Sequence, residues 1–216
     1  MVHLLIERLV VATLILCVSI VPMLATAETK YPALFAFGDS ILDTGNNNKL
    51  ISIIKADYRP YGMSYNGGKP TGRFCDGKVP SDLLAAALGI KDTLPPYYKN
   101  EDLDVKELPT GVCFASGGAG YDNKTSEFVR ILSLYDQLDL FKEYKGKLTE
   151  SVGQQKASEI IANSLYILSS GNNDIAITYT RGKRLMPFPK YAGLLVDWTA
   201  TFLKVRDPFH QFIISF

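Results

Sequence analysis

The sequence predicts an α/β fold with a parallel sheet, and two observations lead to this prediction. Short apolar runs suited to buried strands recur along the chain, and each ends at a glycine or serine that leads into a polar loop. Longer segments with helical character separate these runs. In a parallel sheet, catalytic and ligand-binding groups lie just beyond the carboxyl ends of the strands, so we expect the polar loops to meet at one edge. The expected strands are 33–37, 112–115 and 165–168.

Four segments are expected to be helices: 81–88, 126–145, 149–162 and 191–204. The first begins at a residue that can cap a helix, Ser81, and ends at Gly89. In the second, apolar residues recur at steps of three and four, which is typical of an amphipathic helix packed on a core. The turn-rich segment 59–70 is expected to be a surface loop.

The composition is that of one globular domain. At 216 residues, of which 47% are hydrophobic, the chain can bury a sizeable core, and a net charge of +1 is ordinary. The 23 basic and 22 acidic residues are interspersed, without the clustered basic stripe that nucleic-acid binding requires. No cysteine or histidine spacing suggests a metal site, and the glycines at 117–120 do not have the spacing of a dinucleotide-binding loop. We therefore expect no nucleic-acid partner and no cofactor.

The first 27 residues are expected to be a secretory signal peptide rather than part of the fold. The apolar run 9–24 follows Arg8, and Ala25-Thr26-Ala27 is a small-x-small cleavage site. A membrane anchor is the alternative, but the run is short for a bilayer span and is followed directly by the cleavage site. We expect a secreted, extracellular protein with no stable membrane anchor after cleavage, whose residues 28–216 form one domain.

Secretion changes how the cysteines and a glycosylation motif are interpreted. Cys17 is lost with the signal peptide, which leaves Cys75 and Cys113 in an oxidising compartment. A disulfide between them and two separate thiols are both compatible with the sequence. Asn123 begins an Asn-Lys-Thr sequon in a polar stretch, which predicts a glycan site.

The first expected strand leads directly into Gly38-Asp39-Ser40. These three residues alone fit an ordinary turn before a helix. The longer string at 35–48, Phe-Ala-Phe-Gly-Asp-Ser-Ile-Leu-Asp-Thr-Gly-Asn-Asn-Asn, resembles the first block of the plant GDSL esterase/lipase family of SGNH hydrolases. Further segments resemble family blocks in the family's order, and the cysteines in two of them are closest to the extracellular-lipase branch. These segments are 72–82, 111–120 and 171–174, within a resemblance that covers about 31–204.

The resemblance implies a three-layer α/β/α, flavodoxin-like fold and a serine hydrolase of carboxylic esters, with an acyl lipid or an acetyl ester as substrate. By the family's motifs, Ser40 is the nucleophile, and its own N–H, the N–H of Gly118 and the side chain of Asn173 hold the oxyanion. A glycine suits the second position because an oxyanion can approach its backbone closely. Cys113 stands where the family usually has asparagine, which changes the local hydrogen bonds expected in that loop. A flavodoxin-like nucleotide binder shares the strand pattern but needs a phosphate-cradling sequence, which is missing here.

The general base is the difficulty. With His3 removed in the signal peptide, His210 is the one remaining histidine, and it follows Asp207 by three residues. The family's block is Asp-x-x-His-Pro, and Gln211 replaces the proline. Because the tail from about residue 205 does not resemble the family, we interpret the Asp207/His210 spacing as a coincidence. The alternative to an active esterase is therefore a C-terminally truncated, inactive product that at most binds an acyl ligand, with the strand at 165–168 left as an open edge.

Overall fold

The computed structural model describes residues 29–182, 186–205 and 212–215. Contacts group residues 31–216 into one compact unit, and the account below concerns that unit. Its strands are β1 (Leu34–Gly38), β2 (Leu165–Ser169) and β3 (Phe212–Ser215). Its α-helices are α2 (Pro80–Ala87), α3 (Asn123–Val129), α4 (Leu134–Val152), α5 (Gln154–Asn163), α6 (Thr180–Gly182) and α7 (Phe188–Val205). Short helical turns complete it: 3-10 turns η2 (Asn46–Lys49), η3 (Asn66–Gly68) and η4 (Val105–Thr110), and a π-helical turn η5 (Asp174–Tyr179).

The three strands form a parallel sheet in the order β1-β2-β3. Leu34 pairs with Leu165 and Gly38 with Ser169, so the carboxyl ends of β1 and β2 lie side by side. Every residue of these two strands is buried, as expected for strands covered on both faces. The predicted α/β fold with a parallel sheet is confirmed.

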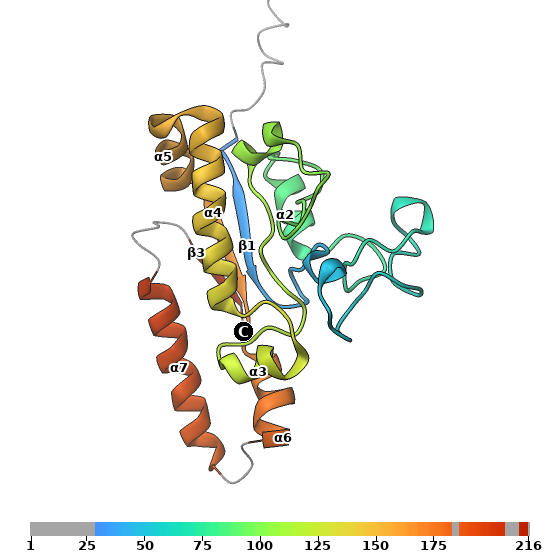
Figure 1. Ribbon diagram of the computed structural model, residues 1–216, viewed down its shortest axis with the longest axis vertical. Coiled ribbons are helices and arrows are strands. Elements are labelled where there is room, and N and C mark those ends of the chain that lie inside the picture. The colour runs from blue at the N-terminus through green and yellow to red at the C-terminus, as the bar shows by residue number, and fades with distance from the viewer. Residues whose placement is uncertain (1–28, 183–185, 206–211, 216) are drawn as a thin grey trace, which may run out of the picture. The chain divides into compact units, whose positions relative to one another are not determined.

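Helices cover both faces of this sheet. In β1, Phe35 and Phe37 face a cluster that includes Phe141 and Tyr144 of α4, with the Phe35 ring 5.4 Å from that of Phe141. The alternate residues of β1 face a second cluster that contains Ala85 of α2. Because successive side chains of a strand point to opposite faces, α2 and α4 lie on opposite sides of β1 (Figure 1). The arrangement is the three-layer architecture that the sequence predicted.

The segment 112–115 is buried beside β1 but does not form a regular strand. Phe114 N–H donates to Ala36 O at 2.8 Å, and the pairing consists of isolated bridges at Cys113. On the other side of this segment lie Pro95 and Pro96, and proline has no N–H with which to extend a ladder. The prediction of an extended, buried segment therefore holds, but the regular strand expected there does not form.

Two predicted helices are divided differently in the structure. The expected helix 126–145 is interrupted at Arg130, which has a left-handed backbone with φ of 55°. Ser133 then begins α4 with a capping box: its Oγ accepts from Asp136 N–H, and Asp136 accepts from Ser133 N–H at 2.8 Å. Gly153, with φ of 83°, ends α4 and separates it from α5. The prediction of one continuous helix over 126–145 is wrong, because these local caps outweigh the apolar periodicity.

The prediction that β2 forms an open edge is also wrong. Residues Phe212–Ser215 pair with β2 in parallel, with Tyr166 opposite Phe212. The sequence Phe-Ile-Ile-Ser has the β-branched and aromatic residues typical of a strand, although it does not resemble the family's sequence pattern. The predicted helix 191–204 is present as α7. Asp207 and His210 lie outside the described residues, so the proposed coincidence stays a prediction.

Candidate active site

Ser40 lies on the turn that follows β1. Gly38 has φ of 123°, and a Cβ there would lie 1.9 Å from Ser169 O, so only glycine allows the two strand ends to approach. Asp39 N–H then donates to Ser169 O at 3.0 Å, and Asp43 N–H donates to Asp39 O at 3.1 Å. Ser40 is half-buried on this turn. Neither its Oγ nor its N–H has a hydrogen-bond partner among the residues that the structure describes.

Gly118 lies in the buried loop 111–120. Its φ of 94° requires glycine, and a Cβ there would meet Val129 at 3.4 Å and Ile54 at 3.5 Å. Within the described part of the chain, no hydrogen-bond acceptor is present for the Gly118 N–H. The amide is therefore available to a bound group.

The loop that follows Ser40 is hydrogen-bonded to the loop 111–120, which carries Gly118. One carboxylate oxygen of Asp43 accepts from Gly117 N–H at 2.9 Å, and the other accepts from Gly45 and Asn46 N–H groups at 2.8 Å each. Asn47 Nδ2 donates to Gly117 O at 2.9 Å. Hydrogen bonds of a buried carboxylate are strong and directional, so these contacts fix one loop against the other.

Asn173 follows β2 and lies between the other two loops. Its Nδ2 donates to Ala119 O at 3.0 Å and to Asp39 Oδ2 at 3.4 Å. Ala119 is the neighbour of Gly118, and Asp39 is the neighbour of Ser40. The structure thus brings together the three loops that carry the predicted nucleophile and oxyanion donors.

The sequence analysis missed the role of Asp174. Its buried carboxylate accepts from Tyr121 N–H at 2.8 Å, Asp122 N–H at 2.9 Å and Thr125 Oγ1 at 2.7 Å. These bonds tie the Asn173 loop to the start of α3, immediately after the Gly118 loop. The sequence around Asp174 does not predict this role, because a local pattern cannot show partners about fifty positions away.

Gln137 of α4 is a second residue whose role the analysis missed. Its side chain accepts from Gly38 N–H at 2.8 Å and donates to Gly38 O at 2.9 Å, so it satisfies both backbone groups at the end of β1. A signal for this role was present: Gln137 is a polar residue on the face that Leu134 and Phe141 bury.

Burial raises the pKa of two carboxyl groups in the turn after β1. The pKa of Asp39 rises from 3.8 to about 6, mainly through desolvation and with a contribution from the charge of Asp174. The pKa of Asp43 also rises to about 6 through desolvation, although its three N–H donors oppose the shift. Burial raises the pKa of Asp174 as well.

We expect the free energy of unfolding to increase as the pH falls from 7 to 5. A folded-state pKa of about 6, above the unfolded value of 3.8, means that the folded protein binds more protons in this range. Each of the two groups should therefore raise the free energy of unfolding by about 1.3 kcal/mol in total between pH 7 and pH 5. Urea unfolding at several pH values measures the slope. Asp43→Asn should remove one group's share of it. A free energy of unfolding that falls steadily from pH 7 to 5 would contradict the expectation.

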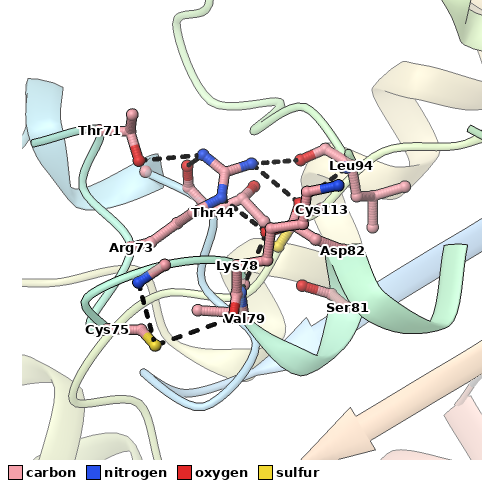
Figure 2. A network of polar contacts seen from close by, with 12 residues as sticks. Thr44, Thr71, Arg73, Cys75, Lys78, Val79, Ser81, Asp82, Leu94 and Cys113 are labelled. Carbon is pink, nitrogen blue, oxygen red and sulfur yellow. Dashed lines mark hydrogen bonds and ion pairs between the residues drawn. The ribbon is translucent and has the colours of Figure 1, made fainter. Parts of the chain in front are cut away.

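The second segment that resembles a family block, 72–82, contributes a buried ion pair. Arg73 bonds Asp82 through Nε at 2.6 Å and through Nη2 at 2.9 Å, and its Nη1 donates to Thr44 O at 3.1 Å (Figure 2). Burial lowers the pKa of Arg73, but the bonds to Asp82 more than offset this effect, so the net shift is upward. Arg73 therefore anchors block 72–82 to the segment that follows Ser40.

Cys75 and Cys113 are separate free thiols in the structure. Cys113 is buried and bonds Leu42 O at 3.1 Å, and burial raises its pKa to about 12. Cys75 lies on the loop of block 72–82 and contacts Gly77 N–H at 3.5 Å (Figure 2). Of the two alternatives that the sequence left open, the structure has the thiols.

The predicted glycan site lies at the first turn of a helix. Asn123 is the first residue of α3 and is exposed, whereas Thr125 of the sequon is buried against Asp174. Glycosylation of Asn123 stays a prediction.

An apolar cavity of about 350 Å³ adjoins the loop after β2. Its lining includes Gly171, Asn172, Ile175 and Leu195, but none of the three predicted site residues. Within the described ranges, no group of three or more His, Cys, Asp or Glu side chains is placed to hold a metal ion. None of the helices in that same part of the chain is both long and apolar enough to cross a membrane.

Comparison with known proteins identifies one family to which this chain is similar. The family model described as GDSL-like Lipase/Acylhydrolase matches residues 34–197. The Arabidopsis thaliana protein GDSL esterase/lipase At1g23500 is 49% identical over 173 residues, which cover 80% of this chain and 50% of the relative. GDSL esterase/lipase EXL3 from the same plant is 47% identical over 174 residues, which cover 80% of this chain and 48% of the relative.

A third Arabidopsis thaliana protein, GDSL esterase/lipase At5g63170, extends the match. It is 43% identical over 203 residues, which cover 92% of this chain and 60% of the relative. The chain thus spans about half the length of the first two relatives. Since the family model covers most of the sequence and spans β1, β2 and the loops that follow them, the chain belongs to the GDSL-like lipase/acylhydrolase family.

Proposed function

We propose that this protein is a secreted serine hydrolase of carboxylic esters. The observation that carries the proposal is the meeting of three loops, which bring Ser40, Gly118 and Asn173 to the carboxyl ends of β1, the segment 112–115 and β2. An ester-cleaving serine needs an accessible hydroxyl and amide donors at the place where negative charge develops. Both kinds of group are available here.

In the proposed reaction, Ser40 Oγ attacks the ester carbonyl carbon and loses its proton to a general base. The carbonyl oxygen becomes an oxyanion that accepts from the N–H groups of Ser40 and Gly118 and from the Asn173 amide. Collapse expels the alcohol, which takes up the proton, and water then hydrolyses the acyl-enzyme. The longer contact of Asn173 Nδ2, at 3.4 Å to Asp39, is the one that gives way to the oxyanion.

The general base is the part of the machinery still to be identified. The described residues contain no histidine, and Asp207 and His210 lie outside them. By family resemblance the base belongs to an Asp-x-x-His-Pro block, which this sequence lacks.

Asn173→Ala is expected to raise the activation barrier by about 2.7 to 4 kcal/mol, because one oxyanion donor is lost. The measurement is kcat for p-nitrophenyl butyrate hydrolysis by the natural secreted protein and its variants. Asn172→Ala is the matched control, since Asn172 is the exposed neighbour of Asn173. Equal losses in the two variants would show that the Asn173 amide has no special role.

Cleavage of the signal peptide after Ala27 is expected to give a mature chain that begins at Glu28. N-terminal sequencing of protein collected from the extracellular medium measures this directly. Recovery of the protein only in a membrane fraction with Met1 retained would reject secretion while leaving the ester chemistry untouched.

A further inference from the structure

Three large apolar side chains are exposed together beside the Gly118 loop. Ile51, Ile53 and Phe128 have exposed fractions of 87%, 89% and 65%, and all three line one hollow of about 590 Å³. We call these three residues the apolar rim. Scattered exposed apolar residues are ordinary, but a group around one hollow marks an interaction site.

The rim is held out from the core by polar anchors. Ser52, between the two exposed isoleucines, donates from Oγ to Val129 O at 2.5 Å. Asn47 Nδ2 donates to Ile54 O at 2.8 Å. Ile54 and Val129 pack inward in a small aliphatic cluster, whereas their sequence neighbours Ile53 and Phe128 face solvent. The exposure of the rim is therefore built into the fold.

Cations surround the rim. Lys55 and Arg130 line the same hollow, and no carboxylate is among its described lining residues. The Arg181 guanidinium lies 6.0 Å from the centre of the Phe128 ring. Exposed carboxylates of Asp57 and Glu127 are close in sequence, so the local charge is mixed but the hollow itself is positive. Apolar protrusions edged with cations complement a surface that is apolar within and anionic at its boundary.

The rim is also fixed relative to the proposed oxyanion donor. Asn47 Nδ2, which holds Ile54, donates as well to Gly117 O at 2.9 Å. The inward-facing Ile54 and Val129 are the residues that a Cβ on Gly118 would touch. One layer of side chains therefore separates the rim from the backbone at Gly118.

We propose that the apolar rim docks this protein onto a lipid interface that carries anionic headgroups. Ile51 and Ile53 insert among the acyl chains while Lys55, Arg130 and Arg181 contact the headgroups. One part of this inference rests on the proposed function: docking presents aggregated acyl esters to Ser40.

The test uses the mature chain with Ser40→Ala, so that binding is measured without turnover. We expect this protein to co-sediment with phosphatidylcholine vesicles that contain phosphatidylglycerol, and much less with vesicles of phosphatidylcholine alone. Adding Ile51→Ser and Ile53→Ser should lower the partition constant on the order of a hundredfold. Arg130→Gln and Arg181→Gln should each lower it about fivefold. Leu83→Ser with Val105→Ser, at two sites that are each 56% exposed, should leave it unchanged.

Binding that survives loss of both isoleucines, or that is equal for the two vesicle types, overturns the proposal. A second outcome would also overturn the proposal: the protein does not bind vesicles and is a dimer, and Ile51→Ser with Ile53→Ser converts this dimer to a monomer. That result would identify the apolar rim as a subunit interface. Hydrolysis of soluble p-nitrophenyl acetate by the natural secreted protein, with Ser40 intact, is the separate readout of the proposed function. Vesicle binding without hydrolysis rejects the esterase alone, and hydrolysis without vesicle binding rejects the docking surface alone.

Discussion

Ser40→Ala is expected to abolish labelling of the protein by a fluorophosphonate and to lower kcat for p-nitrophenyl ester hydrolysis by a factor on the order of 10⁶. The reason is that Ser40 forms the covalent bond to the acyl group in the proposed reaction, and the oxyanion donors alone leave only a small fraction of the rate. Protein purified from its natural source is the appropriate material, because its intact mass also shows where the chain ends. Mapping the labelled peptide identifies the reactive hydroxyl.

Ser116→Ala provides a control for this experiment. Ser116 is a buried serine of the neighbouring loop, and its Oγ bonds Asn47 Oδ1 at 2.5 Å, so its loss affects packing rather than the nucleophile. Labelling that persists in Ser40→Ala would reject the assignment.

The same assay addresses the general base. We expect the 216-residue chain to be inactive or nearly so, and His210→Ala to change nothing. If the chain hydrolyses p-nitrophenyl acetate well above background and His210→Ala abolishes the activity, Asp207 and His210 form a working dyad and the interpretation of their spacing as coincidence is wrong.

Arg73→Ala is expected to lower the free energy of unfolding by about 3 to 5 kcal/mol, because it leaves the fully buried Asp82 carboxylate without its cation. The loss should also loosen the segment after Ser40, since Arg73 Nη1 holds Thr44 O. Urea unfolding monitored by the fluorescence of the single tryptophan measures the stability.

Lys78→Ala is the matched control for Arg73→Ala. Lys78 pairs with Asp92 at 2.5 Å, but the Asp92 side chain is 84% exposed, so this surface pair should contribute at most about 1 kcal/mol. Similar losses of stability in the two variants would contradict the role assigned to the buried pair.

The sequence by itself determined β1, β2, the loops that follow these two strands, and the family. β1 and β2 were predictable because their apolar runs are local and end abruptly at Gly38 and Ser169. The boundary at Ser133 was also encoded locally, as a capping box, but the apolar periodicity obscured it. The short strand β3 was missed because the tail was judged by its lack of family resemblance rather than by its own composition.

Only the tertiary structure decided how the loops are joined. Gln137 reaches Gly38, 99 positions earlier, and the Asp43 carboxylate receives the Gly117 N–H, 74 positions later. A buried polar group must find a partner wherever the fold supplies one, so its sequence neighbours do not reveal which partner that is. The exposure of Ile51 and Ile53 could not be predicted either, because closely spaced isoleucines are typical of a core. Only the hydrogen bonds of Ser52 and Asn47 show that this segment is anchored at the surface.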